Sequence, residues 1–310
     1  MNYHIITAVD ANYEAGLRLF IKNLEKQAVA DYQLNIIILD NGLKPKQIQW
    51  AQDEVSAINK NYESCYTIEF KQIDLIKFKH LEGLYNQSLA TYSKLFIPEL
   101  VEYKDALYVD PDMIIALNVS AMIDYARATK AHYGMCIDQI GMTLAEECPW
   151  HDELALSEKV LPYYNAGLIY FNLEQARSDE FTRKGLELIS DCNKPLKYYD
   201  QTVLNFLLRG RVTSLPESFN VTRNYNLYLS TWKGDTNIHF IGGFKPWGAS
   251  NKLKYQESIR IYRDWMDLPQ LPANKLDKFK IMIVRLKLAF AIKAKRRFKE
   301  MIKLSLPKSY

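Results

Sequence analysis

The stretch "ALYVDPDMIIAL" (Ala106–Leu117) places two aspartates, Asp110 and Asp112, between two apolar runs. A D-x-D by itself carries little information, because it arises by chance about once in a chain of this length. Its position at the end of a buried-strand pattern is the informative feature. Side chains alternate along a strand, so the two carboxylates would face the same way if the strand continued through them.

Around this stretch, the first 140 residues alternate strand-like and helix-like segments. Apolar runs predict strands at 3–10, 32–40, 66–73 and 106–110, and amphipathic patterns predict helices at 13–27, 46–58 and 90–100. Such alternation predicts an α/β fold with a mostly parallel sheet that is covered by helices on both faces. Ligands of such sheets bind beyond the carboxyl ends of the strands, which makes Asp10, Asp40 and Asp110 candidate site residues.

The later part of the chain is more mixed. Its patterns predict strands at 133–138 and 165–173, helices at 174–190 and 201–209, and a glycine- and aromatic-rich loop at 231–250. We expect one main domain at 1–266, a proline-rich linker at 267–274 and a basic amphipathic helical segment at 275–310.

The composition is that of a globular protein with a sizeable core, since 48% of the 310 residues are hydrophobic and 25% are charged. The N-terminal sequence lacks the basic region of an export signal, and no apolar stretch is long enough for a membrane span. The 4 cysteines form no C-x-x-C pair, which favours reduced, mostly buried thiols in a cytoplasmic protein and disfavours a zinc site.

The net charge of +4 hides an asymmetry between the body and the end of the chain. Residues 275–310 carry 12 Lys and Arg against 2 Asp and Glu, so the tail has a balance of +10 and the rest has −6. Phe279, Met282, Ile283 and Leu286 recur at helical spacing among these cations. This pattern predicts peripheral attachment to an anionic membrane surface through 275–304, with packing of the helix on the body as the alternative. No motif supports nucleic-acid binding.

Two carboxylates at an apolar sheet end repel each other, and a hard divalent cation removes the conflict. Mg²⁺ or Mn²⁺ typically binds one or two carboxylates together with the phosphates of a substrate. The alternative is a solvated turn, because Asp and Pro are ordinary turn residues. An aspartyl phosphatase is disfavoured, because an apolar run at 113–115 follows the second aspartate in place of a flexible loop.

Other polar residues add to a possible phosphate and sugar site. His239 ends the short strand-like run "NIHF", and an imidazole suits Mn²⁺ as a third ligand. Gly242 would let main-chain N–H groups approach an anion, and Lys245 would supply a positive charge. Asn165 offers an amide to a sugar hydroxyl. Asp200 begins a predicted helix next to Gln201, where it could equally be an N-cap.

Five motifs, in order and at family-like spacing, resemble glycosyltransferase family 8, and the resemblance covers roughly residues 3–247. They are "ITAVDANY", "LYVDPDMII", "YYNAGLIYFNL", "YYDQTVLN" and "HFIGGFKPW". The resemblance implies a GT-A type nucleotide-sugar-binding fold and a retaining hexosyltransferase with UDP-hexose as donor. It also implies Mn²⁺ as cofactor, with Mg²⁺ possible.

The resemblance also assigns roles to individual residues. The implied metal ligands are Asp110, Asp112 and His239; the implied uridine contacts are Asp10 and Asn12; the implied diphosphate contacts are Gly242 and Lys245; the implied sugar-site residues are Asp138, Asn165, Asp200 and Gln201. Lys94 stands where relatives commonly have Arg, which keeps the charge but loses the planar fork of a guanidinium. The segment 139–163 does not match the family and is expected to contribute to the acceptor site.

An amide oxygen is a poor nucleophile, so Gln201 favours same-face attack over a covalent double displacement. The expected function is transfer of galactose or glucose from UDP-hexose to a lipid-linked lipopolysaccharide, lipooligosaccharide or other cell-surface glycan, at the inner face of the cytoplasmic membrane. Transfer to a protein or soluble acceptor is an alternative, as is a membrane-adaptor protein with a decayed sugar site. A sugar-1-phosphate nucleotidyltransferase would need a glycine-rich loop after the first strand, where "AVDANYEAG" offers none.

Overall fold

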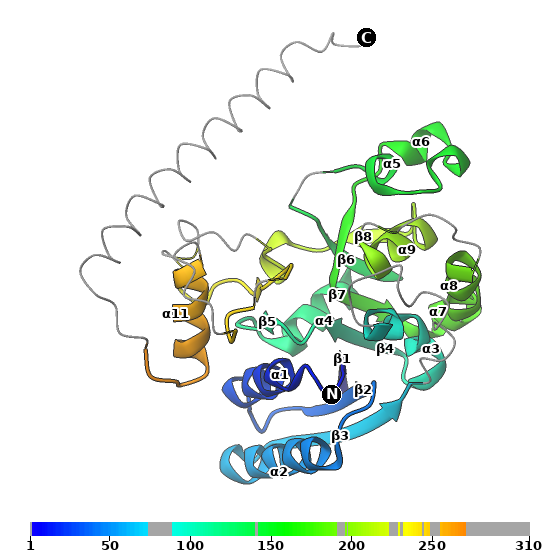
Figure 1. Ribbon diagram of the computed structural model, residues 1–310. Coiled ribbons are helices and arrows are strands. Elements are labelled where there is room, and N and C mark those ends of the chain that lie inside the picture. Colours follow the sequence, from blue (N-terminus) through cyan, green and yellow to red (C-terminus); the bar gives the residue numbers. More distant parts are fainter. Residues whose placement is uncertain are drawn as a thin grey trace, which may run out of the picture. The chain divides into compact units, whose positions relative to one another are not determined.

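The computed structural model describes residues 2–73, 89–139, 142–190, 196, 198–222, 229, 232–243, 245–248 and 255–270 (Figure 1). The chain divides into two compact units. The first unit consists of Met1–Thr222 and Gly234–His239, and the second of Arg223–Lys233 and Phe240–Tyr310.

The main sheet of the first unit has seven strands within the described residues, in the order β3-β2-β1-β4-β7-β6-β8. The strands are β1 (Asn2–Val9), β2 (Gln33–Asp40), β3 (Cys65–Gln72), β4 (Asp105–Val109), β6 (Tyr133–Ile137), β7 (Tyr164–Asn172) and β8 (Val212–Ser214). β3, β2, β1 and β4 are all parallel, as the βαβ alternation predicts, whereas β7 runs antiparallel to both β4 and β6. The predicted α/β fold with a mostly parallel sheet is therefore confirmed.

The reversed direction of β7 matters for the site. Because β7 runs antiparallel, its first residues lie at the sheet edge where β4 and β6 end. Val109 pairs with Leu168, and Cys136 pairs with Asn165 after a register shift that leaves residues 166–168 of β7 without a partner on β6. Polar residues at the start of β7 therefore meet those that follow β4 and β6.

Helices cover both faces of the sheet. One face packs against α1 (Glu14–Lys26), α2 (Pro45–Tyr62) and α4 (Val119–Ala128). The other packs against a 3₁₀ helix (Leu89–Phe96) and against α3 (Ile97–Leu100), α7 (Leu173–Ser178), α8 (Phe181–Ser190) and α9 (Tyr199–Leu207). Neighbouring residues of a strand enter opposite cores: Ile5 faces the first set of helices and Ile6 the second. β1, β2, β4 and β7 are buried on both sides, as continuous apolar runs predict, whereas the edge strands β3 and β8 are partly exposed.

Two smaller features complete the first unit. A second sheet pairs β5 (Met113–Ile114) antiparallel with β9 (Ile238–His239). An insertion after β6 holds α5 (Leu144–Glu147), a 3₁₀ helix (His151–Glu153) and α6 (Leu156–Lys159), with its own small core around Leu144, Cys148 and Tyr163. A further 3₁₀ helix spans Glu217–Phe219. The described cysteines include two buried thiols, Cys136 and Cys148, and the exposed Cys65.

In the second unit, the described helix α11 (Gln256–Trp265) carries aromatic contacts. The Trp247 ring lies 5.6 Å from that of Tyr262, and the Trp232 ring lies 6.0 Å from that of Trp265. Within the described residues, no helix is both long enough and apolar enough to span a bilayer. The predicted basic helical segment at 275–310 lies outside the described residues.

Candidate active site

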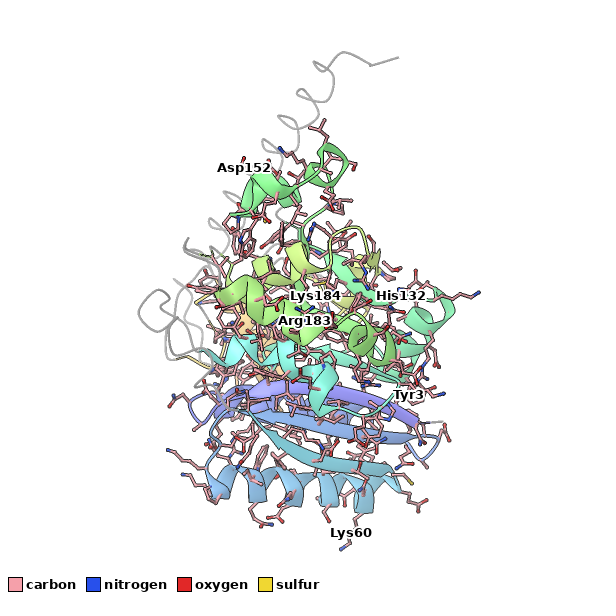
Figure 2. The ribbon with its side chains drawn as sticks, turned by 90° about the vertical axis from the view of Figure 1, so that its right-hand side faces the viewer. Tyr3, Lys60, His132, Asp152, Arg183 and Lys184 are labelled. Atoms are coloured by element: carbon pink, nitrogen blue, oxygen red, sulfur yellow. The ribbon has the colours of Figure 1, made fainter. Side chains whose placement is uncertain are left out.

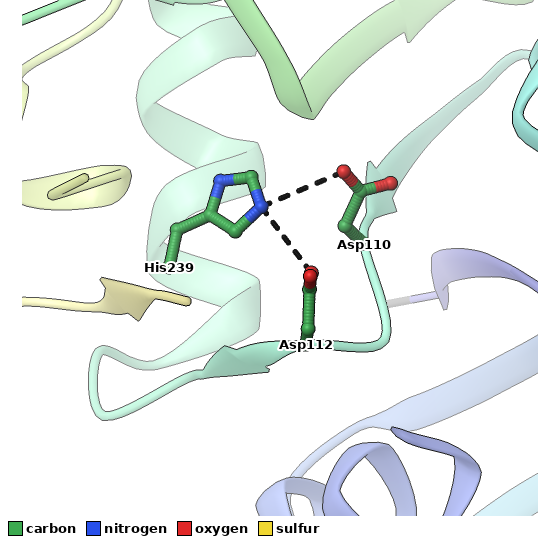
Figure 3. A group of neighbouring side chains, drawn as sticks. All are labelled: Asp110, Asp112 and His239. Carbon is green, nitrogen blue, oxygen red and sulfur yellow. Dashed lines mark ion pairs between the residues drawn. The ribbon is translucent and has the colours of Figure 1, made fainter. Parts of the chain in front are cut away.

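Three side chains that could bind a metal ion converge where β4 ends, and we call them the acid–histidine cluster. They are Asp110, Asp112 and His239 (Figure 3). Nε2 of His239 lies 3.2 Å from Oδ1 of Asp112 and 3.6 Å from Oδ2 of Asp110. Asp112 and His239 are buried, while the Asp110 side chain keeps 22% of its surface exposed. The structure thus brings together the three residues that the family resemblance implies as metal ligands, and their role as ligands stays a prediction.

The chain assembles this cluster through a turn and a short strand pairing. β4 ends at Val109, and Asp110 to Asp112 form a turn, so the strand does not continue through the acidic pair. The chain then enters β5, where Met113 pairs directly with His239 of β9. The turn and this short pairing bring the imidazole to the carboxylates from more than a hundred residues away.

Each carboxylate of the cluster is held on one oxygen and presents the other to the imidazole. Tyr108 donates to Oδ1 of Asp110 at 2.7 Å, and Tyr13 donates to Oδ2 of Asp112 at 3.2 Å. Burial and then the nearby carboxylates raise the pKa of both phenols, which keeps them protonated as donors. The second oxygen of each aspartate faces His239. Such outer contacts are typical of residues that orient metal ligands.

The donor set fits a hard divalent cation. Two carboxylate oxygens and one imidazole nitrogen suit Mn²⁺, and the carboxylates also suit Mg²⁺. Neighbouring ligands of an octahedral cation of this size lie about 3 Å apart, close to the observed nitrogen–oxygen separations. The identity of the metal stays a prediction.

A buried ion triad lies directly beneath the cluster. Nζ of Lys94 is 3.1 Å from Oδ1 of Asp110 and 2.7 Å from Oδ2 of Asp200, and Thr91 also donates to Asp200. Burial alone would lower the pKa of Lys94, but the two carboxylates outweigh it and raise that pKa. Asp200 lies inside α9, whose N-cap is Tyr198, so its alternative reading as an N-cap is wrong.

Amide groups form a second network at the same sheet edge. Asn165 donates to Oε1 of Gln201 at 3.1 Å and to Asp138 at 3.3 Å. Gln201 donates to Asp138 at 3.1 Å, while its Oε1 also accepts the main-chain N–H of Ala166 at 3.1 Å. The predicted sugar-site residues Asp138, Asn165 and Gln201 are therefore in direct contact with one another.

The aspartates that end β1 and β2 have different surroundings. Asp10 accepts the main-chain N–H of Asn12 at 2.8 Å in the turn after β1, where both side chains stay partly exposed. Asp40 is buried, and its Oδ1 accepts the N–H groups of Gly42 and Leu43 at 2.9 and 2.6 Å. Asp40 therefore stabilises a turn, which explains its place at the strand end without a ligand.

Gly242 and Lys245 belong to the second unit. Gly242 has a positive φ of 79°, which favours glycine. Lys245 donates to the main-chain carbonyl of Phe240 at 2.6 Å. The roles of both residues in holding a diphosphate stay predictions.

A family model described as "Glycosyl transferase family 8" matches residues 4–251, which include every candidate site residue named above. The chain belongs to glycosyltransferase family 8. A lipopolysaccharide 1,2-glucosyltransferase of Escherichia coli K12 is 22% identical over 89% of this chain and 83% of its own length. A lipopolysaccharide 1,3-galactosyltransferase of Salmonella typhimurium LT2 is 26% identical over 63% of this chain and 60% of its own length.

The fold of this family 8 glycosyltransferase has solved counterparts. A crystal structure of the galactosyltransferase LgtC, in complex with donor and acceptor sugar analogs, aligns with a TM-score of 0.68 at 20% identity. The alignment covers 87% of this chain and 97% of LgtC. The mixed α/β architecture is thus the GT-A fold.

Several residues of the glycosyltransferase site were not predicted from the sequence. Tyr13 and Tyr108, which hold the two carboxylates, stand next to recognised motif residues and could have been suspected on that ground. Asn220 bridges His239 and Asn165, but it lies in "PESFNV", a stretch without any pattern of its own. Its role depends on two long-range contacts, so no local signal could have found it.

Proposed function

We propose that this glycosyltransferase moves a hexose, galactose or glucose, from UDP-hexose to a glycan acceptor, with retention of the anomeric configuration. The observation that carries the proposal is the convergence of Oδ2 of Asp110, Oδ1 of Asp112 and Nε2 of His239 at the carboxyl end of β4. Open α/β sheets bind their ligands at such an edge. Family membership adds the sugar-transfer chemistry.

The acid–histidine cluster would hold Mn²⁺, or Mg²⁺, against the diphosphate of the donor. When bound, the cation would neutralise the diphosphate and stabilise the charge that develops on UDP as it leaves. Lys245 and the main-chain N–H groups near Gly242 would bind the diphosphate oxygens. Asp10 and Asn12 would contact the uridine.

Lys94 would set the charge of the pocket next to the transferred sugar. It lies between Asp110 and Asp200, is almost completely buried and contacts both carboxylates directly. A buried cation at this position also limits the repulsion between the two aspartates. A lysine is sufficient at this position, because each of the two carboxylates makes only one contact with Lys94 and neither needs the planar fork of an arginine.

The amide network supports same-face attack by the acceptor hydroxyl over a covalent intermediate. A double displacement needs a nucleophile beside the anomeric carbon. Oε1 of Gln201 already accepts hydrogen bonds from Asn165 and from the N–H of Ala166, which lowers the electron density available for attack. Gln201 and Asp138 are then better suited to bind sugar hydroxyls and to stabilise a cationic transition state.

For the acceptor, we propose a lipid-linked lipopolysaccharide, lipooligosaccharide or related surface glycan, since two relatives carry lipopolysaccharide in their names. The basic segment at 275–304 would bring the enzyme to the anionic inner face of the cytoplasmic membrane. The segment 139–163 would contribute to the acceptor site. Activity that requires a lipid-linked acceptor, and that fails with the free glycan, would support this assignment over a soluble acceptor.

The test of the proposed donor is UDP release from a panel of UDP-sugars, with Mn²⁺ or with EDTA and without acceptor. We expect slow hydrolysis of one UDP-hexose that EDTA abolishes. The double variant Asp110→Asn, Asp112→Asn should lose this activity, while Asp53→Asn, on the exposed face of α2, should keep it. If no UDP-sugar of the panel releases UDP, and the protein shows no Mn²⁺-dependent UDP binding, the proposal is refuted.

A further inference from the structure

A chain of side-chain amides connects the acid–histidine cluster with the sugar-site network. Asn220 stands at its centre and is 1% exposed. Its Oδ1 lies 3.1 Å from Nδ1 of His239, and its Nδ2 donates to Oδ1 of Asn165 at 2.8 Å. Asn165 in turn donates to Gln201. The chain therefore runs without interruption from a metal-ligand candidate to the residues proposed to contact the sugar.

A main-chain N–H group determines the direction of every bond in this chain. The N–H of Gly167 donates to Asn165 at 2.9 Å, and a main-chain nitrogen can only donate. The acceptor on Asn165 must therefore be its oxygen, so Asn220 faces that oxygen with its NH₂ group. The oxygen of Asn220 then faces Nδ1 of His239, which must carry the proton.

The same glycine also determines where the imidazole ring lies. A Cβ atom on Gly167 would be 2.1 Å from Cε1 of His239 and 2.5 Å from Nδ1, so the ring packs directly on the main chain of β7. The lack of a Cβ atom at residue 167 is therefore what leaves room for the ring. Asn220 then selects which nitrogen carries the proton in that place.

We infer that Asn220 is a positioning residue, which holds His239 as the Nδ1–H tautomer and directs the lone pair of Nε2 at a divalent cation. The inference rests on the metal site of the proposed function and goes beyond it. Metal-binding histidines usually donate their second N–H to an oxygen that fixes their tautomer and orientation. Here a neutral amide supplies that oxygen and also orients Asn165, so the metal ligand and the sugar-site amides share one support.

The first test is the tautomer of His239 in the full-length protein, read from imidazole ¹⁵N shifts without donor and with saturating Mg²⁺, a diamagnetic cation that occupies the space between Nε2 and the two carboxylates. His239→Gln assigns the signals. Wild type should show protonated Nδ1 and bare Nε2, and Asn220→Ala should show a mixture of tautomers. A wild-type His239 that carries its proton on Nε2 would overturn the inference.

The second test is Mn²⁺ affinity, measured from the electron spin resonance signal of free Mn²⁺. Asn220→Ala should weaken binding by roughly 10- to 100-fold, as removal of an outer-shell partner does elsewhere. Asn220→Asp keeps an oxygen for Nδ1–H but loses the donor to Asn165, so it should restore the Nδ1–H tautomer and most of the affinity. The matched control is Asn237→Ala, a fully buried asparagine whose amide bonds the main chain at Leu117 and Phe219. Its Mn²⁺ affinity should equal that of wild type.

The outcomes separate this inference from the proposed function. An Asn220→Ala variant with unchanged tautomer and Mn²⁺ affinity, or an Asn237→Ala variant with equal loss, would overturn the positioning role. A wild-type protein that takes up no Mn²⁺ would overturn both the metal site and the role of Asn220. Normal Mn²⁺ uptake and tautomer without turnover of any UDP-hexose would count against the proposed donor alone.

Discussion

The chain places one cation between two carboxylates in two very different surroundings. The buried triad consists of Lys94, Asp110 and Asp200, and the exposed triad of Arg183, Glu180 and Glu187. The nitrogen–oxygen distances are 3.1 and 2.7 Å in the first and 2.7 and 2.6 Å in the second. By distance alone the exposed triad is the tighter of the two. Figure 2 shows Arg183 among the surface side chains of α8.

Burial, not distance, separates the two triads. The Lys94 side chain is 4% exposed, whereas Arg183 is 51% exposed. Water competes for every contact in the exposed triad, and exposed pairs contribute little. In the buried triad, loss of the cation leaves two carboxylates without their ion pair at a site where water has little access. The contribution of an ion pair to stability or to activity therefore cannot be judged from its nitrogen–oxygen distance alone. The burial of the pair must be known as well.

The largest effect is expected from Lys94→Met, which breaks the buried triad. The variant leaves Asp110 and Asp200 facing each other without their cation, so the free energy of unfolding should fall by about 3–5 kcal/mol. UDP-hexose hydrolysis should be lost as well, because Asp110 is also part of the acid–histidine cluster. Urea denaturation and UDP release are the two measurements.

Lys94→Arg is the control for that change, because it keeps the charge on a longer side chain. We expect it to retain most of the unfolding free energy and part of the activity. If Lys94→Met were as stable as wild type, the buried triad would be no more important than the exposed one, and the comparison would fail.

The next largest effect should come from Gly167→Ala, which disturbs the acid–histidine cluster at His239 and not at Asp110. The added methyl group would overlap Cε1 of His239, so the ring must leave its place. Overpacking of this kind typically costs about 1–3 kcal/mol of stability. Mn²⁺ binding should be lost in a spin resonance titration.

Gly134→Ala is the matched control for Gly167→Ala. Gly134 also lies in a strand of the main sheet, but its methyl group would meet the Leu215 side chain at 3.0 Å, and a leucine side chain can shift. Mn²⁺ binding should survive in this variant. Equal loss of binding in both variants would show that any disturbance of the sheet removes the metal, and that the contact with His239 has no special weight.

Local patterns in the sequence predicted much of the fold. The apolar runs and amphipathic stretches up to residue 73 correspond to β1, α1, β2, α2 and β3, because parallel strands between helices leave strong periodic signals. The predicted helix at 174–190 is two helices, α7 and α8, separated at Glu180, which has a φ of 55°. A single residue with positive φ leaves the surrounding periodicity unchanged and so gives no signal.

The site was predictable as a set of residues but not as a network. Asp110 and Asp112 could be selected because they follow a buried strand, and His239 because it ends another. The reversed direction of β7 and the pairing of β5 with β9 were not predictable, because both depend on partners far along the chain. These two features place Asn165 beside Asp138, and His239 beside Asp112.

A smaller effect is expected when Mn²⁺ is added to the intact protein. A ligand that binds only the folded state stabilises it by about 2.7 kcal/mol when its free concentration is about 100 times Kd. The melting temperature should therefore rise by several degrees and return to its starting value with EDTA. The rise should be absent in Asp112→Asn and unchanged in Arg183→Ala. A rise in Asp112→Asn that equals the wild-type rise would place the ion elsewhere.

The smallest effect is expected from Arg183→Ala, which removes the cation of the exposed triad. Glu180 and Glu187 regain full hydration when Arg183 is lost, so neither carboxylate is left buried with an uncompensated charge. The melting temperature, the urea midpoint and UDP release should all equal those of wild type, in low and in high salt. Lys184→Ala, at the neighbouring position of α8, controls for the loss of one positive charge. A large destabilisation by Arg183→Ala, with none in Lys184→Ala, would mean that geometry can outweigh exposure in this protein, and that burial is not what separates the two triads.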